Sequence, residues 1–145
     1  MMARWEVEDF GKSILDKLDS DTNRKIRREM VRNGAKVLQK EMQMATEARH
    51  HVVNHWMKDS IAAGEVHEDI DGVSIEVYPQ GEDPRGVSNE MKMQIINHGY
   101  YHVLTGEKRG KKDFFLNDKF RKKCAPRIVS VMQATLAKCM EQLNK

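Results

Sequence analysis

The sequence predicts an α+β fold with a single domain over residues 1–145, in which long N-terminal helices and a C-terminal helix pack on a small antiparallel sheet. Two observations give this class. Apolar residues recur every three or four positions through 22–45 and again through 128–143, as on one face of a helix. Between these stretches, residues 66–78 alternate apolar and polar side chains around an Asp-Gly pair, the pattern of a β-hairpin.

The composition excludes several classes of protein. Charged residues make up 32% of the chain and aromatic residues 6%, which is typical of a soluble, helix-rich protein. The sequence contains no apolar run of about 18 residues, so no transmembrane helix is expected. Acidic residues occur where a signal peptide needs an apolar core, so we expect the protein to stay in the cytoplasm where it is made.

The two cysteines, Cys124 and Cys139, have neither the spacing of a metal site nor that of a disulfide framework. On one straight helix, fifteen residues would separate them by roughly 22 Å, which is too far for a disulfide. We therefore expect two free thiols in a reducing compartment. A thiol that bridges two copies of the chain is the alternative.

Two helices are predicted in the first third of the chain. Residues 5–18 place Val7, Phe10, Ile14, Leu15 and Leu18 on one face, which predicts a short peripheral helix within residues 1–20. Residues 19–21 supply capping side chains for a helix from residue 22 to the mid-forties. Its apolar stripe consists of Ile26, Met30, Gly34, Val37, Leu38, Met42 and Ala45. The glycine indicates close approach by another element, and the methionines indicate core packing, with a Met-rich partner groove as the alternative.

The middle of the chain is predicted to change from helix to sheet. Residues 46–61 continue the helical pattern after a bend at 47–50. The hairpin follows. Its buried face is predicted to consist of Val73, Ile75 and Val77, and its solvated face of Ser74 and Glu76. Residues 79–87 contain prolines, glycines and charges and are expected to form a loop. Residues 88–90 then cap a short helix at 91–97.

The last third is predicted to combine a short strand, a basic loop and a long helix. Residues 100–104 are strand-like, and the glycine- and lysine-rich 105–113 segment is expected to be a flexible loop. Phe114 and Phe115 are interpreted as the hinge that pins this loop to the core, where the last helix starts near residue 115 or 117. Pro126 is expected to kink or interrupt that helix, because proline loses a backbone hydrogen bond and clashes with the preceding turn.

The net charge of +3 conceals a strong asymmetry along the chain. Residues 64–90 contain eight acids and a single base, Arg85, and therefore have a net charge of −7. Residues 108–127 contain nine bases and two acids and have a net charge of +7. Complementary patches of this kind favour head-to-tail association between copies, because opposite potentials steer and orient the encounter. Two solvated faces without a partner are the alternative.

Histidines supply the only weak candidates for catalysis or metal binding. His51 and His55 have the four-residue spacing of two metal ligands on a helix, but the H-E-x-x-H order is absent, so a partly exposed pair is favoured. His98 and His102 flank two tyrosines, which favours an interface over a small hydrolase site. We therefore propose no catalytic residue and no metal from the sequence.

The glycines and lysines of 105–113 invite comparison with a phosphate-binding loop. The G-x-x-x-x-G-K-[ST] order is absent, so no nucleotide cofactor is expected. Basic segments do bind phosphate backbones without reading sequence. A nucleic-acid-binding module using residues 108–127 therefore stands as the alternative function.

Several short motifs follow one another in a set order: M-K-D-S-I at 57–61, the hairpin at 66–78, P-R-G-V-S-N at 84–89, I-I-N-H-G at 95–99 and F-F-L at 114–116. This order, over residues 26–136, resembles the phage minor tail-component family of siphophages and prophages, whose members are also called tail-completion, neck or head–tail joining proteins. One departure occurs at 50–55, where the family often has a Thr-Gly pair and this chain reads H-H-V-V-N-H.

The resemblance implies a structural protein rather than an enzyme, without a cofactor, made in the host bacterial cytoplasm and carried in the virion tail or neck. It implies a homo-oligomeric ring, closed through two different patches on each subunit, from a chain that can be monomeric in isolation. Head-closure and tail-tube proteins are the implied partners, with non-specific DNA contact in addition and no membrane. Loops 79–88 and 105–113 are expected to order upon assembly. The expected interface residues are Glu68, Asp69, Glu82, Asp83, Arg85, Tyr100, Tyr101, Lys108, Arg109, Lys111 and Lys112.

Overall fold

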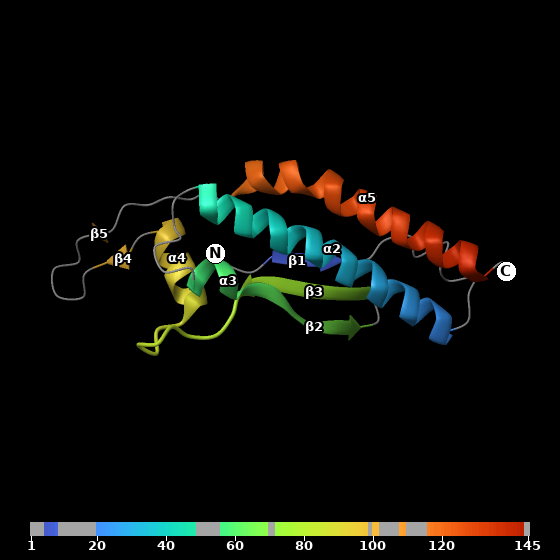
Figure 1. The fold of residues 1–145 in the computed structure, drawn as a ribbon, viewed down its shortest axis with the longest axis horizontal. Coiled ribbons are helices and arrows are strands. Elements are labelled where there is room, and N and C mark those ends of the chain that lie inside the picture. The colour runs from blue at the N-terminus through green and yellow to red at the C-terminus, as the bar shows by residue number, and fades with distance from the viewer. Residues whose placement is uncertain are drawn as a thin grey trace.

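The computed structural model describes residues 5–8, 20–48, 56–69, 72–98, 100–101, 108–109 and 116–143. Its helices and small antiparallel sheet confirm the predicted α+β class. In Figure 1, helix α5 (Asp118–Leu143) lies along helix α2 (Ser20–Ala48), and α2 covers the sheet. The C-terminal helix thus reaches the sheet layer mainly through α2. Within the part of the chain that is described, no helix is long and apolar enough to cross a membrane.

Helix α2 confirms the predicted long helix and its apolar face. Ile26, Met30, Leu38 and Met42 are all buried, as the spacing of three and four residues requires. Val37 and Ala45 lie at the margin of this face, while Val31, Ala35 and Thr46 add to the buried side. The helix ends at Ala48, and a short helix α3 (Trp56–Ser60) precedes the sheet. The expected bend at 47–50 falls largely outside the described residues.

The central sheet confirms the predicted hairpin. Strand β2 (Ile61–Asp69) pairs antiparallel with β3 (Gly72–Pro79), whose alternation buries Val73, Ile75 and Val77. The helix predicted through residue 61 is wrong at its last position, because Ile61 already pairs with Pro79. A β-bulge follows, in which Gly64 and Glu65 together stand opposite one residue of β3. Because of this extra residue, β2 starts at Ile61, although apolar and polar side chains alternate strictly only after the bulge.

The helix predicted from residue 5 is wrong for strand β1 (Trp5–Glu8), which pairs with β3 as the third strand of the sheet. Val7 is buried and pairs with Ile75, whereas its neighbour Glu6 is exposed. This two-residue alternation was hidden in the sequence by the helical spacing of later apolar residues. Residues 9–19 lie outside the described chain, so the rest of the predicted helix stays a prediction.

Helix α5 runs without a break through Pro126, so the predicted interruption is wrong, while the predicted kink stays a prediction. Asn117 caps the helix, because its Oδ1 accepts the N–H of Phe120 at 3.1 Å. Pro126 removes the bond to the carbonyl of Lys122, but both residues are exposed and water can satisfy that carbonyl. Buried Cys124 and Met132 on either side hold the helix against its neighbours. Packing thus compensates for the proline.

Helices α2 and α5 run antiparallel and are joined by polar contacts along their length. Arg127 pairs with Glu41, Asn33 donates to Thr135 Oγ1 at 3.0 Å, and Cys139 Sγ lies 3.6 Å from Glu29 Oε2. Gly34 lies between these contacts and confirms the close approach predicted from its place on the stripe. A Cβ there would lie 3.0 Å from Val7 Cγ1 of β1 and 3.2 Å from Ile128 Cγ2 of α5.

Both cysteines are buried free thiols on α5, as predicted. Burial raises the pKa of Cys124 and of Cys139, and the nearby carboxylates of Glu41 and Glu29 raise them further. Because the thiolate is the reactive form, both thiols should resist iodoacetamide near pH 8 in the folded protein and react readily in denaturant. Mass spectrometry of the alkylated chain measures this, and rapid double labelling of the folded protein would contradict it.

The remaining elements lie after the sheet. Helix α4 (Asn89–His98) matches the predicted short helix, since Ser88 Oγ accepts the N–H of Met91 at 3.2 Å. Strands β4 (Tyr100–Tyr101) and β5 (Lys108–Arg109) form a separate two-stranded ribbon. The predicted 105–113 loop is thus wrong at 108–109, because antiparallel pairing with the two tyrosines, seven to nine residues earlier, makes these residues a strand. The Phe114–115 hinge and residues 102–104 lie outside the described chain.

Candidate functional site

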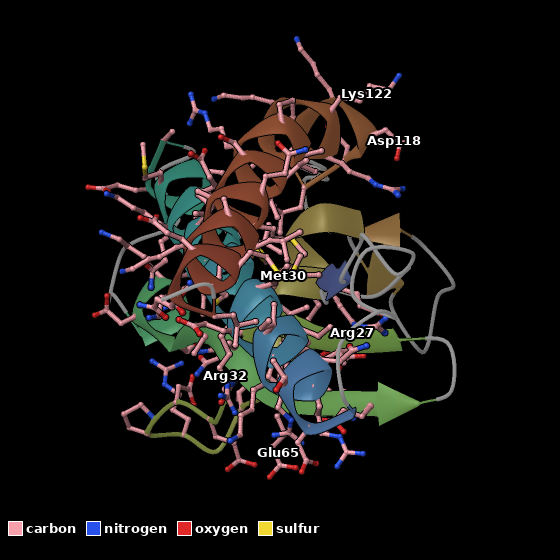
Figure 2. All side chains as sticks on the ribbon, turned by 90° about the vertical axis from the view of Figure 1, so that its right-hand side faces the viewer. Arg27, Met30, Arg32, Glu65, Asp118 and Lys122 are labelled. Carbon is pink, nitrogen blue, oxygen red and sulfur yellow. The ribbon has the colours of Figure 1, made fainter. Side chains whose placement is uncertain are left out.

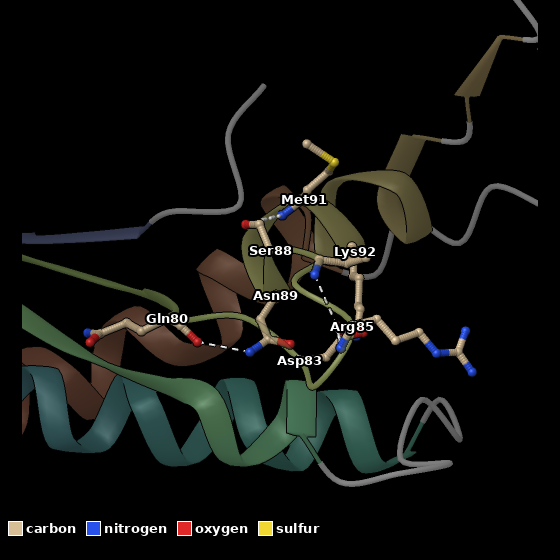
Figure 3. A network of polar contacts seen from close by, with 8 residues as sticks. Gln80, Asp83, Arg85, Ser88, Asn89, Met91 and Lys92 are labelled. Atoms are coloured by element: carbon tan, nitrogen blue, oxygen red, sulfur yellow. Dashed lines mark hydrogen bonds and ion pairs between the residues drawn. The ribbon is translucent and has the colours of Figure 1, made fainter.

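The loop at 80–88 joins β3 to α4 and is built around the carboxylate of Asp83. Its Oδ1 accepts the backbone N–H of Arg85 at 2.9 Å and that of Val87 at 3.0 Å, while Oδ2 pairs with the ammonium of Lys92 (Figure 3). The backbone closes the same turn, because Gly86 N–H donates to the Asp83 carbonyl at 2.9 Å. One side chain thus organises both the tip of the loop and its link to α4.

A second set of hydrogen bonds fixes the base of this loop. The Asn89 side chain donates to the Gln80 carbonyl at 2.9 Å, and the Gln80 side chain donates to the carbonyls of Ala62 and Ala63 on β2. Gly81 and Gly86 have φ values of 72° and 82°, which side chains other than glycine adopt with strain. The loop therefore has its own order in the single chain, contrary to the expectation that 79–88 orders only upon assembly.

The Lys92 partner, followed by the backbone donors, lowers the pKa of Asp83 from 3.8 to about 2. A lowered folded-state pKa means that the interaction is fully present above the unfolded value of 3.8 and is lost as pH falls through about 2. We therefore expect the Asp83 carboxyl carbon to titrate by NMR near pH 2, with the amides of Arg85 and Val87 moving together. A titration near 4 would contradict the arrangement.

The variant Asp83→Asn keeps the shape of the side chain and removes its charge. We expect faster hydrogen exchange at the Arg85 and Val87 amides, because the Lys92 pair no longer holds the acceptor in place. Glu82→Gln, a neutralisation at the adjacent exposed position, is the matched control and should leave both amides unchanged. Equal exchange rates in the two variants would contradict the role given to Asp83.

The ordered loop and α4 present apolar side chains to solvent. Val87, Met91 and Ile95 are 38%, 54% and 38% exposed and follow one another at four-residue intervals. Arg85 and Glu82 are exposed beside them and make no ion pair among the described residues. In Figure 3, the Arg85 side chain extends away from the loop while Asp83 and Lys92 point into the network. We call the outward residues Glu82, Arg85, Val87, Met91 and Ile95 the loop surface.

The acidic residues predicted for one interface are separated by the fold. Glu68 lies near the end of β2 that pairs with Gly72, whereas the 80–88 loop follows the opposite end of the hairpin, about 25 Å away for a nine-residue strand. Glu68 also pairs with Arg24 at 3.2 Å and with Arg28, both on α2. Part of the acidic segment is thus neutralised within the subunit, and Asp83 is likewise paired internally with Lys92.

The structure describes some of the other predicted interface residues. Tyr100 pairs with Arg109, and Tyr101 with Lys108, so the tyrosines and the basic segment do come together in the β4–β5 ribbon. Asp69 closes the hairpin opposite Gly72. Lys111 and Lys112 lie outside the described residues, as do His51, His55 and His102.

A hollow of about 830 Å³ lies between α2 and β2, and sequence reasoning missed it. Its apolar wall comes from Ala62, Ala63, Val66 and Ile75 around the β-bulge, and its charged rim from Arg28, Arg32 and Lys36 of α2 with Glu29 and Glu65. Figure 2 shows Arg32 and Glu65 on the same side of the molecule. Among the described residues, Arg32, Lys36 and Glu65 make no ion pair. We call this feature the α2–β2 hollow.

The sequence did contain signals for both surfaces. The cations Arg24, Arg28, Arg32, Lys36 and Lys40 recur every fourth residue, which places them in one row along α2. Val87, Met91 and Ile95 show the same interval across the cap of α4. Neither pattern reveals from the sequence that the row borders a hollow or that the stripe faces solvent.

The comparison with known families agrees with the motif order. The family model described as "Bacteriophage HK97-gp10, putative tail-component" matches residues 9–102, which is more than half of the chain. No curated protein and no solved structure matches the chain. The matched range includes α2, the hairpin, the 80–88 loop and α4, and it ends before β5 and α5. The resemblance to phage minor tail components is thus confirmed, and the chain belongs to the HK97-gp10-like family of bacteriophage tail components.

Proposed function

We propose that this structural tail component is a tail-completion or head–tail joining subunit, which assembles as a homo-oligomeric ring on the phage tail. Its work would be to bind a neighbouring copy, together with head-closure and tail-tube proteins, rather than to catalyse a reaction. It would be made in the host cytoplasm and carried into the virion tail or neck. The loop surface is the observation that supports this proposal most strongly.

The loop surface combines exposure with order. Apolar side chains at Val87, Met91 and Ile95 are exposed, yet the backbone beneath them is fixed by Asp83 and Asn89. A surface that is ordered before binding loses little conformational entropy on association, which favours recognition. A fixed apolar stripe with polar residues beside it is therefore a good candidate for a permanent contact within a particle.

Charge complementarity remains part of the proposal, with a narrower set of residues. Glu68 and Asp83 are paired within the subunit, so the acids that remain for a neighbour include Glu65 and Glu82. The exposed cations on the first turns of α5 are Lys119, Arg121, Lys122 and Lys123. A ring needs two different patches on each subunit that meet and close, and opposite charges would set their register.

Deletion of the gene from the phage tests the function directly. We expect electron microscopy to show filled heads and tails that accumulate separately, and infectivity to return when the intact chain is supplied in trans. Native mass spectrometry of the protein with its tail tube should show several copies of the chain for each tube end. Joined, infectious particles after the deletion, or a single copy on each tube, would contradict the proposal.

DNA contact is the second candidate, favoured by the four exposed cations of α5. Binding through phosphate contacts should weaken steeply with salt and show little sequence preference. The variant Lys122→Glu/Lys123→Glu should weaken binding to a random duplex and reduce its salt dependence, as measured by fluorescence anisotropy. Affinity that these substitutions leave unchanged would remove this candidate.

A further inference from the structure

We propose that the loop surface of one copy docks into the α2–β2 hollow of a second copy. This inference rests on the proposed self-assembly and adds the two surfaces that meet. Both lie on one chain but are built from different residues, so each subunit can offer its loop to one neighbour and its hollow to another. Such a contact is heterologous and can close into a ring.

The charges of the two surfaces are complementary and unsatisfied within the subunit. The hollow offers the cations Arg32 and Lys36 and the acid Glu65, and none of these three makes an ion pair among the described residues. The loop offers the acid Glu82 and the cation Arg85, both exposed and also without an ion pair in that part of the chain. Glu82 would face Arg32 and Lys36, while Arg85 would face Glu65.

The apolar residues of the loop surface and of the hollow are also complementary. Val87 is 38% exposed at the tip of the loop, and the wall of the hollow is made of small apolar residues, including Ala62, Ala63 and Val66. Protein interfaces usually have an apolar centre and a polar rim. Insertion of Val87 between the paired charges would give this arrangement. Because the loop is already held by Asp83, docking would need little reorganisation.

The composition of the hollow argues against other occupants. A small-molecule site is mostly apolar with a few polar groups, whereas five charged side chains border this one. A nucleic acid backbone would place phosphates beside Glu29 and Glu65, which would repel them. A protein segment that carries both signs of charge and an apolar side chain avoids both conflicts, and the 80–88 loop is such a segment.

Charge inversion provides a test in which two defects cancel. We expect Glu82→Lys alone, and Arg32→Glu/Lys36→Glu alone, each to raise the dissociation constant for self-association at least about tenfold. Mixing the two variant proteins should restore assembly, because each mutant surface then meets an oppositely charged one. Analytical ultracentrifugation of the full chain measures all three. Glu141→Lys and Lys138→Glu, at exposed positions of α5 that belong to neither surface, are the matched controls.

Cross-linking defines the contact independently of affinity. In the chain carrying both Val87→Cys and Ala63→Cys, oxidation should give covalent multimers, whereas either substitution alone should not, since native Cys124 and Cys139 are buried. Multimers that stop at two copies would uphold the docking and overturn the ring. A ring unaffected by the charge inversions and without this cross-link would overturn the docking alone. If neither assembly nor the cross-link is found with the tail-tube protein present, both the docking and the ring are overturned.

Discussion

Replacing Gly34 by leucine is expected to lower the free energy of unfolding by about 3 kcal/mol. Gly34 lies where α2, α5 and β1 meet, and even a Cβ would come within 3.0 Å of Val7 Cγ1 and within 3.2 Å of Ile128 Cγ2 and Met132 Cγ. A leucine adds three further carbons to that space and must separate the elements. The gain in helix propensity over glycine, about 1 kcal/mol, offsets only part of this loss.

Two control variants separate crowding from propensity. Gly34→Ala gains the same propensity with one methyl group, so its effect should be far smaller than that of leucine. Lys25→Leu places the same side chain at an exposed position of α2 and should change stability by less than about 0.5 kcal/mol. Urea unfolding followed by circular dichroism measures all three. A leucine variant as stable as the wild type would show that the three elements do not meet at this glycine.

Gly34 also illustrates what could be predicted from the sequence. Its place on the apolar stripe indicated that another element approaches α2, and the structure adds that two do so, β1 and α5. The hairpin was predictable for the same reason, since Val73, Ile75 and Val77 repeat with the period of a strand. Regular periodicity is a local property, and a local property can be read from a sequence.

The elements that were predicted wrongly depend on contacts with other segments of the chain. Strand β1 exists because Val7 pairs with Ile75, and β5 because Lys108 pairs with Tyr101. Helix α5 continues past Pro126 because its buried residues pack on both sides of the proline. In each case the tertiary contact outweighs the local preference of the segment.

The candidate site was predicted less well than the fold, because a net charge along the sequence says nothing about geometry. The acidic 64–90 segment is folded into a hairpin whose ends lie far apart, and Glu68 and Asp83 are paired internally. Arg85 and Glu82 were predicted as interface residues and are exposed, which agrees with that expectation without testing it. The α2–β2 hollow joins residues more than twenty positions apart and has no counterpart in sequence periodicity.

The second large effect is expected from Met42→Ala, which should lower the free energy of unfolding by about 2–5 kcal/mol. Met42 is fully buried on α2 and belongs to the same core cluster as Met30 and Ile61. Removing most of its side chain leaves a cavity in a close-packed interior, and the loss of both contacts and burial destabilises the fold.

Met44, only two residues further along the same helix, is 51% exposed and provides a control with the same chemistry. Met44→Ala should change stability by less than about 0.5 kcal/mol, because little of its surface is removed from water. The pair also decides between the two interpretations of the methionines on α2. If they lined a groove for a partner, both substitutions would leave the free chain stable and would weaken assembly instead. A large loss of stability confined to Met42 assigns the buried methionines to the core.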